Sequence, residues 1–322
     1  MERKFFKLSI CILMLSACKK DIQTAPDFKD NYADYNDFIT KNEGKVQVYF
    51  ISGINGGTFK TPQGTVVRVP PHAFVSQSGI QVTGAVTINF IDVYKKSDMV
   101  LSGMDTYSLV GLLKSGGEFF IQAFSDNSAV QISAGSKIDI VQPVALTAGM
   151  DPGMQPFIFQ NPITMPGGWL PILNHIDSSS NPQPIAASLS DSVDNYIFSL
   201  YSFNSPVSSG TWCNSDNLSY FSAYPQTPLT FLSSDSMSNY NTQTFLIFKN
   251  INSMVHVYGG PGSFVYNYAP RGFPCTLVAI GFNNHTLYSS FTPFTIGVNQ
   301  KINFTLSPTT TGAFKAQLQA LN

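Results

Sequence analysis

The feature that most constrains the fold of this chain is a series of short runs rich in β-branched and aromatic residues. In residues 45–145 these runs include 82–91, 118–124 and 137–141, and turns containing glycine or asparagine separate them. Such runs are typical of strands, and glycine and asparagine supply the backbone conformations that tight turns need. Short strands with turns about every ten residues predict an all-β fold built from β-sandwiches.

The same pattern divides the chain into two parts. Strand-like runs resume at 196–203 and continue through 244–248, 276–282 and 301–306. The intervening residues 146–190 are rich in proline, glycine and serine, which favour loops. We therefore predict two Greek-key-like β-sandwich domains, at 45–145 and 191–322, joined by a loop-rich connector at 146–190. The only helix expected lies at the extreme end, at 312–321.

Composition narrows the class of protein. Only 11% of the residues are charged, whereas globular chains average about 25%, and this low charge suits a secreted β-rich protein. The 26 Phe and 14 Tyr residues can bury enough surface to exclude a disordered chain. The formal net charge is −1, so nothing in the charge balance favours nucleic acid as a partner.

The N-terminus predicts the compartment. Residues 1–17 begin with basic residues and continue into an apolar run at 8–14, which is too short to span a bilayer core of about 30 Å. This is the pattern of a signal peptide. Residues 18–44 are polar, acidic and without apolar periodicity, so we expect them to form a tether.

The end of the leader carries a more specific signal. Leu15-Ser16-Ala17-Cys18 resembles the lipobox of bacterial lipoproteins. The resemblance implies that Cys18 carries fatty acyl chains such as palmitate and anchors the protein to the outer membrane. A plain secretory leader with an incidental cysteine is the alternative.

Two cysteines remain in the body of the chain. Cys11 leaves with the leader and Cys18 would be lipidated, which leaves Cys213 and Cys275. In an oxidising envelope these two could form a disulfide, worth about 3–4 kcal/mol through loop closure. Two buried free thiols are the alternative.

Longer segments resemble a known group of proteins. Residues 64–74, 79–88 and 115–119 resemble the N-terminal domain of a family of Bacteroidetes envelope lipoproteins, and 64–74 is distantly similar to the ZU5 β-sandwich. Residues 212–216, 270–272 and 306–310 resemble the C-terminal half of the same lipoproteins. The resemblance implies fold and envelope location, but no activity is established for the family and no catalytic residue follows from it. Lysines stand after Cys18 where surface-exported relatives carry acidic residues, so the periplasmic and external faces of the membrane both remain open.

Motifs for metal or cofactor chemistry are missing from the sequence. The histidines His72, His175, His256 and His285 are far apart from one another and from the cysteines. This spacing gives no zinc motif, and we find no nucleophile elbow, phosphate loop or dinucleotide fingerprint. We expect no metal and no cofactor. His256 lies between two valines, so we expect it to face solvent from a strand.

Carboxylates are the residues that could support hydrolysis. Glu118 is the only glutamate after residue 44, and a glycosidase would have to pair it with an aspartate about 5–10 Å away. The neighbouring sequence favours a simpler role, in which Glu118 is a charge at the edge of a turn that answers Lys114. Asp92, Asp98 and Asp105 could together bind calcium, but their spacing is not that of a calcium loop.

One local segment could contact a ligand. In Trp212-Cys213-Asn214-Ser215-Asp216, the indole ring of Trp212 could stack on a sugar while Asn214 and Asp216 bind its hydroxyls. The alternative is structural, with Trp212 covering the core and the polar residues satisfying a turn. Ser192 and Ser236 lie in Asp-Ser-apolar triplets that match the O-glycosylation pattern of Bacteroidetes envelope proteins.

These observations favour a non-catalytic lipoprotein of the cell envelope that binds or scaffolds a protein or glycan partner. The alternative is an envelope glycan hydrolase that uses Glu118 or clustered aspartates, and it requires those carboxylates to converge in one cleft. A structural subunit of an envelope complex would instead present a flat apolar patch.

Overall fold

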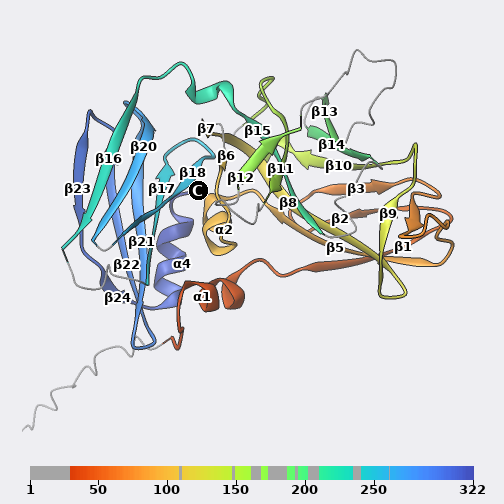
Figure 1. Ribbon diagram of the computed structural model, residues 1–322, viewed down its shortest axis with the longest axis horizontal. Coiled ribbons are helices and arrows are strands. Elements are labelled where there is room, and N and C mark those ends of the chain that lie inside the picture. The colour runs from red at the N-terminus through yellow and green to blue at the C-terminus, as the bar shows by residue number, and fades with distance from the viewer. Residues whose placement is uncertain are drawn as a thin grey trace, which may run out of the picture.

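The computed structural model describes residues 30–108, 111–146, 149–160, 168–172, 187–192, 195–201, 210–234, 241–260 and 262–322. In this part of the chain strands predominate and form four sheets, so the predicted all-β fold is confirmed. Figure 1 shows two lobes side by side, with short helices near the region where they meet.

The first lobe contains a ten-stranded sheet and a five-stranded sheet. The main path of the larger sheet runs in the order β1 (Gln47–Ser52), β5 (Ala85–Val93), β8 (Lys114–Ser125), β15 (Thr211–Asn217), β11 (Gln155–Gln160), β12 (Gly168–Pro171), β6 (Tyr107–Ser108) and β7 (Gly111–Leu112). β9 (Ser128–Ile132) extends from β8, and β4 (Phe74–Ser76) pairs with β9. The smaller sheet runs β13 (Ala187–Ser192), β14 (Asn195–Tyr201), β10 (Lys137–Pro143), β3 (Val66–Val69) and β2 (Gly57–Lys60).

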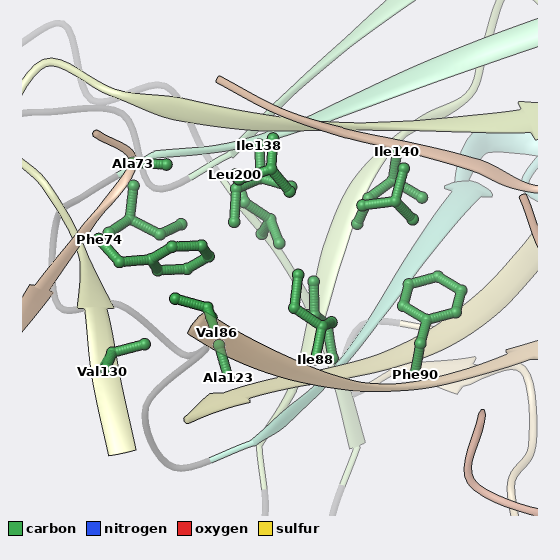
Figure 2. Packing of buried hydrophobic residues seen from close by; sticks show 14 of the residues in the cluster. Ala73, Phe74, Val86, Ile88, Phe90, Ala123, Val130, Ile138, Ile140 and Leu200 are labelled. Atoms are coloured by element: carbon green, nitrogen blue, oxygen red, sulfur yellow. The ribbon is translucent and has the colours of Figure 1, made fainter. Parts of the chain in front are cut away.

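The two sheets enclose the first hydrophobic core because their strands alternate between inward apolar residues and outward residues. In β5 the inward positions are Val86, Ile88 and Phe90, all 0% exposed. They face Ile138 and Ile140 from β10, as Figure 2 shows. The runs 82–91 and 137–141, which contain these positions, were both predicted as strands.

The expected boundary between the domains is wrong. β11 and β12 lie in the stretch predicted as a connector, yet both are strands of the ten-stranded sheet. The segment 191–217 was assigned to the second domain, but β14 pairs with β10 and β15 pairs with β8. The first lobe therefore extends to about residue 217, because strand partners are chosen by contacts distant in sequence that local patterns do not reveal.

The second lobe is a sandwich of a four-stranded and a five-stranded sheet. The first runs β19 (Gly259–Gly260), β20 (Ser263–Pro270), β16 (Gln226–Ser233) and β23 (Gln300–Phe304), and the second runs β18 (Met254–Val257), β17 (Thr242–Phe248), β21 (Pro274–Asn283), β22 (Thr286–Thr295) and β24 (Ser307–Thr309). Leu246 and Phe248 of β17 face the core between these sheets, whereas Phe245 and Ile247 belong to a separate cluster on the opposite face.

Three α-helices contribute to that separate cluster: α1 (Tyr35–Asn42), α2 (Lys96–Leu101) and α4 (Thr311–Gln319). Two single 3-10 turns, η1 (Val144–Leu146) and η2 (Ser219–Phe221), are the other helical segments in the described part of the chain. α4 agrees with the helix predicted at the end of the chain. Within the described part of the chain, no helix combines the length and apolarity needed to cross a bilayer.

α1 corrects the prediction that residues 18–44 form only a tether. Asp34 caps this helix by accepting a hydrogen bond from the Asp37 amide at 2.9 Å. Phe38 is 0% exposed and lies between the rings of Phe282 and Phe314, at centroid distances of 5.7 and 5.8 Å. From residue 30 onward, this segment is therefore part of the second lobe.

The lobes are joined by reciprocal hydrogen bonds at their junction. The Ser115 amide donates to the Asn252 carbonyl at 2.8 Å, and the Asn252 Nδ2 donates to the Ser115 carbonyl at 3.1 Å. Beside them, the Ser253 hydroxyl donates to the Leu113 carbonyl at 2.8 Å. These residues are buried, so the hydrogen bonds between the lobes lie in a region of low dielectric constant, where they are strengthened.

Candidate functional site

The structure brings three of the candidate residues together. Glu118 lies on β8 directly opposite Asn214 on β15, and Asp216 follows on the same strand after an irregularity in register. Phe119 points into the first core, so Glu118 points to the opposite face of the sheet. Glu118, Asn214 and Asp216 are all 0% exposed.

The predicted role of Glu118 as a charge at a turn edge is wrong. The residue lies inside a twelve-residue strand, and Lys114 instead forms an ion pair with Asp151, with 2.8 Å between Nζ and Oδ2. Pattern reasoning missed this because a single charged residue after two glycines resembles the start of a strand.

Glu118 and Asp216, which we call the acid pair, and the polar groups around them are only partly hydrogen-bonded. Asn214 Nδ2 donates to Asp216 Oδ2 at 2.7 Å, and the Ser115 hydroxyl donates to Asn214 Oδ1 at 3.1 Å. Both carboxyl oxygens of Glu118 and Oδ1 of Asp216 have no hydrogen-bond partner among the described residues. A buried carboxylate in such a position is costly, so it favours its neutral form.

Electrostatics agree with the geometry. Burial raises the pKa of Glu118 well above its ordinary value, and the nearby Asp216 and Asp105 raise it further. Burial also raises the pKa of Asp216. Burial raises the pKa of Asp105 to about 6, although its hydrogen bonds from the amides of His256 and Tyr107 act in the opposite direction.

The acid pair can act on a substrate only if the substrate reaches its carboxyl groups. A glycan hydrolase needs one protonated and one ionised carboxyl on either side of a sugar. Glu118 and Asp216 have no exposed surface and do not line any of the three cavities described for this chain. The carboxylates thus converge as the hydrolase hypothesis requires, but inside the protein and not in a cleft.

The three aspartates that could have bound calcium together lie in different parts of the structure. Asp92 is buried and accepts hydrogen bonds from the hydroxyls of Thr61 and Thr65 at 2.5 and 2.6 Å. Asp98 lies in α2, and Asp105 lies close to β18. Across the described ranges, no group of three or more histidine, cysteine or acidic side chains is arranged to hold a metal ion.

The other predicted contact residues are also placed by the fold. Trp212 is partly buried and packs against Phe120, with 5.7 Å between ring centroids. Asn214 and Asp216 bind each other inside the protein, so the surface does not present them beside the indole. Cys18 and Ser236 lie outside the described residues, as does the side chain of Ser192 at the end of β13.

The structure contains no disulfide between Cys213 and Cys275. Both are buried free thiols. Cys213 belongs to the core of the first lobe and Cys275 to the core of the second, so the two sulfur atoms have no common environment in which to pair.

His256 does not face open solvent, contrary to expectation. Its ring stacks on Phe245, the residue opposite it on β17, with 4.8 Å between centroids. Its Nε2 lies 2.7 Å from Gln243 Oε1. Burial lowers the pKa of His256 to about 4, so the ring is neutral at pH 7.

A second candidate site lies at the far edge of the first lobe. Val46, Val48 and Phe50 are 47%, 51% and 74% exposed and occupy alternate positions on one face of β1 and the residue before it. We call these three residues the β1 patch. The inward residue Tyr49 stacks on Phe59, with 3.9 Å between ring centroids. The apolar side chains of the patch therefore point outward by the geometry of the strand.

β1 is also the terminal strand of the ten-stranded sheet. It pairs with β5 along its whole length, and in the described part of the chain no other strand continues the sheet beyond it. In Figure 1 it follows the chain that leaves α1 and runs along the lower part of the first lobe. An edge strand presents unpaired backbone N–H and C=O groups, and natural proteins usually protect such edges with charge or proline. Residues 46–52 contain neither.

Comparison with known proteins finds no matching family model and no similar curated protein. The assignment of a function therefore depends on the geometry of the described residues.

Proposed function

We propose that this protein is a non-catalytic lipoprotein of the cell envelope that binds an extended segment of a partner protein through β1. The observation that carries the proposal is the β1 patch on an open sheet edge. A peptide that adds to the edge gains main-chain hydrogen bonds, and alternate apolar side chains add specificity. A patch of exposed apolar residues on a folded domain is typical of a protein interface.

The geometry favours a protein partner over a glycan. The amide and carboxylate that could have bound sugar hydroxyls, Asn214 and Asp216, are inaccessible. In contrast, the β1 patch offers two valines and one phenylalanine, which suit a hydrophobic contact and provide no polar group for a sugar. The unpaired backbone groups of the edge are suited to pairing with another strand.

Site-specific photo-cross-linking tests the proposal. A benzophenone amino acid is placed at Phe50 in the full chain, expressed in the source organism, and compared with the same probe at Val298, which is 57% exposed on the second lobe. We expect position 50 to give one cross-linked partner protein that position 298 does not give. In the chain that carries the probe at position 50, Val48→Lys should abolish that cross-link, because the neighbouring Val48 is part of the same patch and a lysine ammonium must be desolvated in an apolar contact.

Identical cross-links from both positions would contradict the proposal, as would persistence of the cross-link when Val48→Lys is combined with the probe at position 50. A cross-link to a second copy of this chain would assign the edge to self-association. Hydrogen exchange on the purified complex then distinguishes the mode of binding, since strand addition slows the exchange of β1 amides and contact through side chains alone does not.

The anchor is a separate part of the proposal. It is supported by the resemblance of residues 15–18 to a lipobox, and it places the protein at the outer membrane. We predict that Cys18→Ala moves the protein from the membrane fraction to the soluble envelope fraction, because two or more acyl chains are needed for stable anchoring. Protease treatment of intact cells reports the face: digestion means external display, and protection means the periplasm. Retention of Cys18→Ala in the membrane fraction would refute the lipid anchor.

A further inference from the structure

The most deeply buried lysine of the described chain lacks an acidic partner. Lys96 begins α2, is 4% exposed, and donates from Nζ to the Phe248 carbonyl at 2.7 Å. The ion pairs found within 4.0 Å in the described residues involve Lys41, Lys114 and Lys137 instead. A buried ammonium ordinarily needs a counter-charge, and one carbonyl uses only one of its three donors.

A cavity of about 250 Å³ lies beside Lys96. Lys95 and Lys96 line it from the first lobe, and Asn250 and Asn252 line it from the turn between β17 and β18 of the second lobe. Tyr94, Leu146, Ile251 and Asn322 complete the wall. Among the described residues that line this space there is no aspartate or glutamate. We call it the junction cavity.

The surroundings of Lys96 support a deficit of negative charge. Burial lowers the pKa of Lys96 to about 8, and no nearby charged group contributes to this change. Asp98, the acidic residue of the same helix, instead bonds to the Ser97 hydroxyl at 3.2 Å. An anion in the junction cavity would supply the missing charge, and it would make a charge-assisted hydrogen bond of the stronger kind.

We propose that the junction cavity is a binding site for a small oxyanion of the carboxylate or phosphate class, held by Lys96 with help from Lys95 and Asn250. The volume is several times the roughly 30 Å³ that one water molecule occupies, so it accommodates a compact anion. Because the lining comes from both lobes, the bound anion stabilises the contact between them. This site is independent of the β1 patch.

The test is calorimetric titration of the full chain with sodium phosphate and, separately, sodium acetate, in chloride buffer of constant ionic strength. We expect saturable binding of at least one anion and a matching rise in Tm. Binding of phosphate alone identifies a phosphate site, and binding of acetate alone identifies a carboxylate site. No saturable binding of either anion would overturn the proposal.

Variants locate the site. Lys96→Gln should weaken binding by about tenfold or more, since it removes the charge-assisted hydrogen bond. Lys301→Gln, at an exposed position on β23, should leave binding unchanged. If Lys96→Gln does not fold, Lys95→Gln at an exposed position of the same cavity must weaken binding. Full binding by the lysine 96 variant, or equal weakening by Lys301→Gln, would refute the assignment.

Discussion

Glu118 shows how a single side chain can oppose the stability of the fold that contains it. Its carboxyl group is fully buried and has no hydrogen-bond partner among the described residues, and the nearby Asp216 and Asp105 raise its pKa further. The protonated form is tolerated in this position, whereas the ionised form would be an uncompensated buried charge. The stability of the protein should therefore depend on pH through this residue.

The sign of that dependence follows from the raised pKa. In the unfolded chain Glu118 ionises near its ordinary value, whereas the folded chain keeps its proton to a much higher pH. Above about pH 4.3 the unfolded state is therefore favoured progressively until the folded pKa is reached. Each pH unit of this interval lowers the free energy of unfolding by about 1.4 kcal/mol.

We predict that Glu118→Gln removes much of this fall. The variant should match the wild type near pH 4 and exceed it in stability at pH 8, because glutamine cannot ionise and its amide can donate to the free oxygen of Asp216. Urea denaturation at several pH values between 4 and 8 checks the difference. Parallel pH profiles for the two proteins would show that Glu118 does not titrate in this range.

Individual residues also show the limit of pattern reasoning. Alternation predicted a strand correctly at β5, because its alternate apolar residues must enter a core, and the run at β10 was also correctly predicted as a strand. At β1 both faces carry large apolar residues, so the pattern does not say which face is inside. In the structure the face that carries Tyr49 points inward, where Phe59 on β2 provides a stacking partner. The exposed β1 patch follows from that choice.

At the scale of elements, α1 is the clearest departure from expectation. Its eight residues include Tyr35, Phe38 and Ile39 among acidic and polar residues, and such a short helix has little stability of its own. Its stability comes from the second lobe, where Tyr32 also contacts Phe38 at a centroid distance of 5.1 Å. The sequence around α1 could not predict this contact, because its partners Phe282 and Phe314 lie more than two hundred residues further along the chain.

We predict that Phe38→Ala lowers the free energy of unfolding by about 3–5 kcal/mol, the usual cost of emptying a buried aromatic site. Phe50→Ala is the matched control, since the same side chain is 74% exposed there and its loss should change stability by less than about 0.5 kcal/mol. Chemical denaturation of both variants measures the contrast. Equal, small effects would mean that α1 does not contribute to the stability of the second lobe.

At the scale of the whole molecule, the junction determines whether the lobes act as one body. Asn252 contributes both its carbonyl and its side-chain amide to Ser115, and Thr106 bonds to the Met254 carbonyl through its hydroxyl at 2.7 Å. α2 crosses from the first lobe to pack its Met99 and Val100 with residues of the second. These contacts couple the unfolding of one lobe to that of the other.

We therefore predict a single cooperative transition in calorimetry of the wild-type protein. Asn252→Ala should lower stability by about 1–3 kcal/mol, because it leaves the buried Ser115 carbonyl without its side-chain donor. It should also broaden or split the transition as the coupling weakens. Two well-separated transitions in the wild type would show that the lobes unfold independently.

The position of Asp30 has a mechanical consequence. Its carboxylate accepts from the amide and hydroxyl of Thr311 at 2.5 and 2.8 Å, and the Asn31 amide donates to the His285 carbonyl at 3.1 Å. A tension applied to the chain before Asp30 is therefore taken up by the second lobe. The force reaches β1, which follows α1 in the chain (Figure 1), only after α1 has detached from the second lobe. β1 therefore keeps its conformation while the protein is pulled from its N-terminal side.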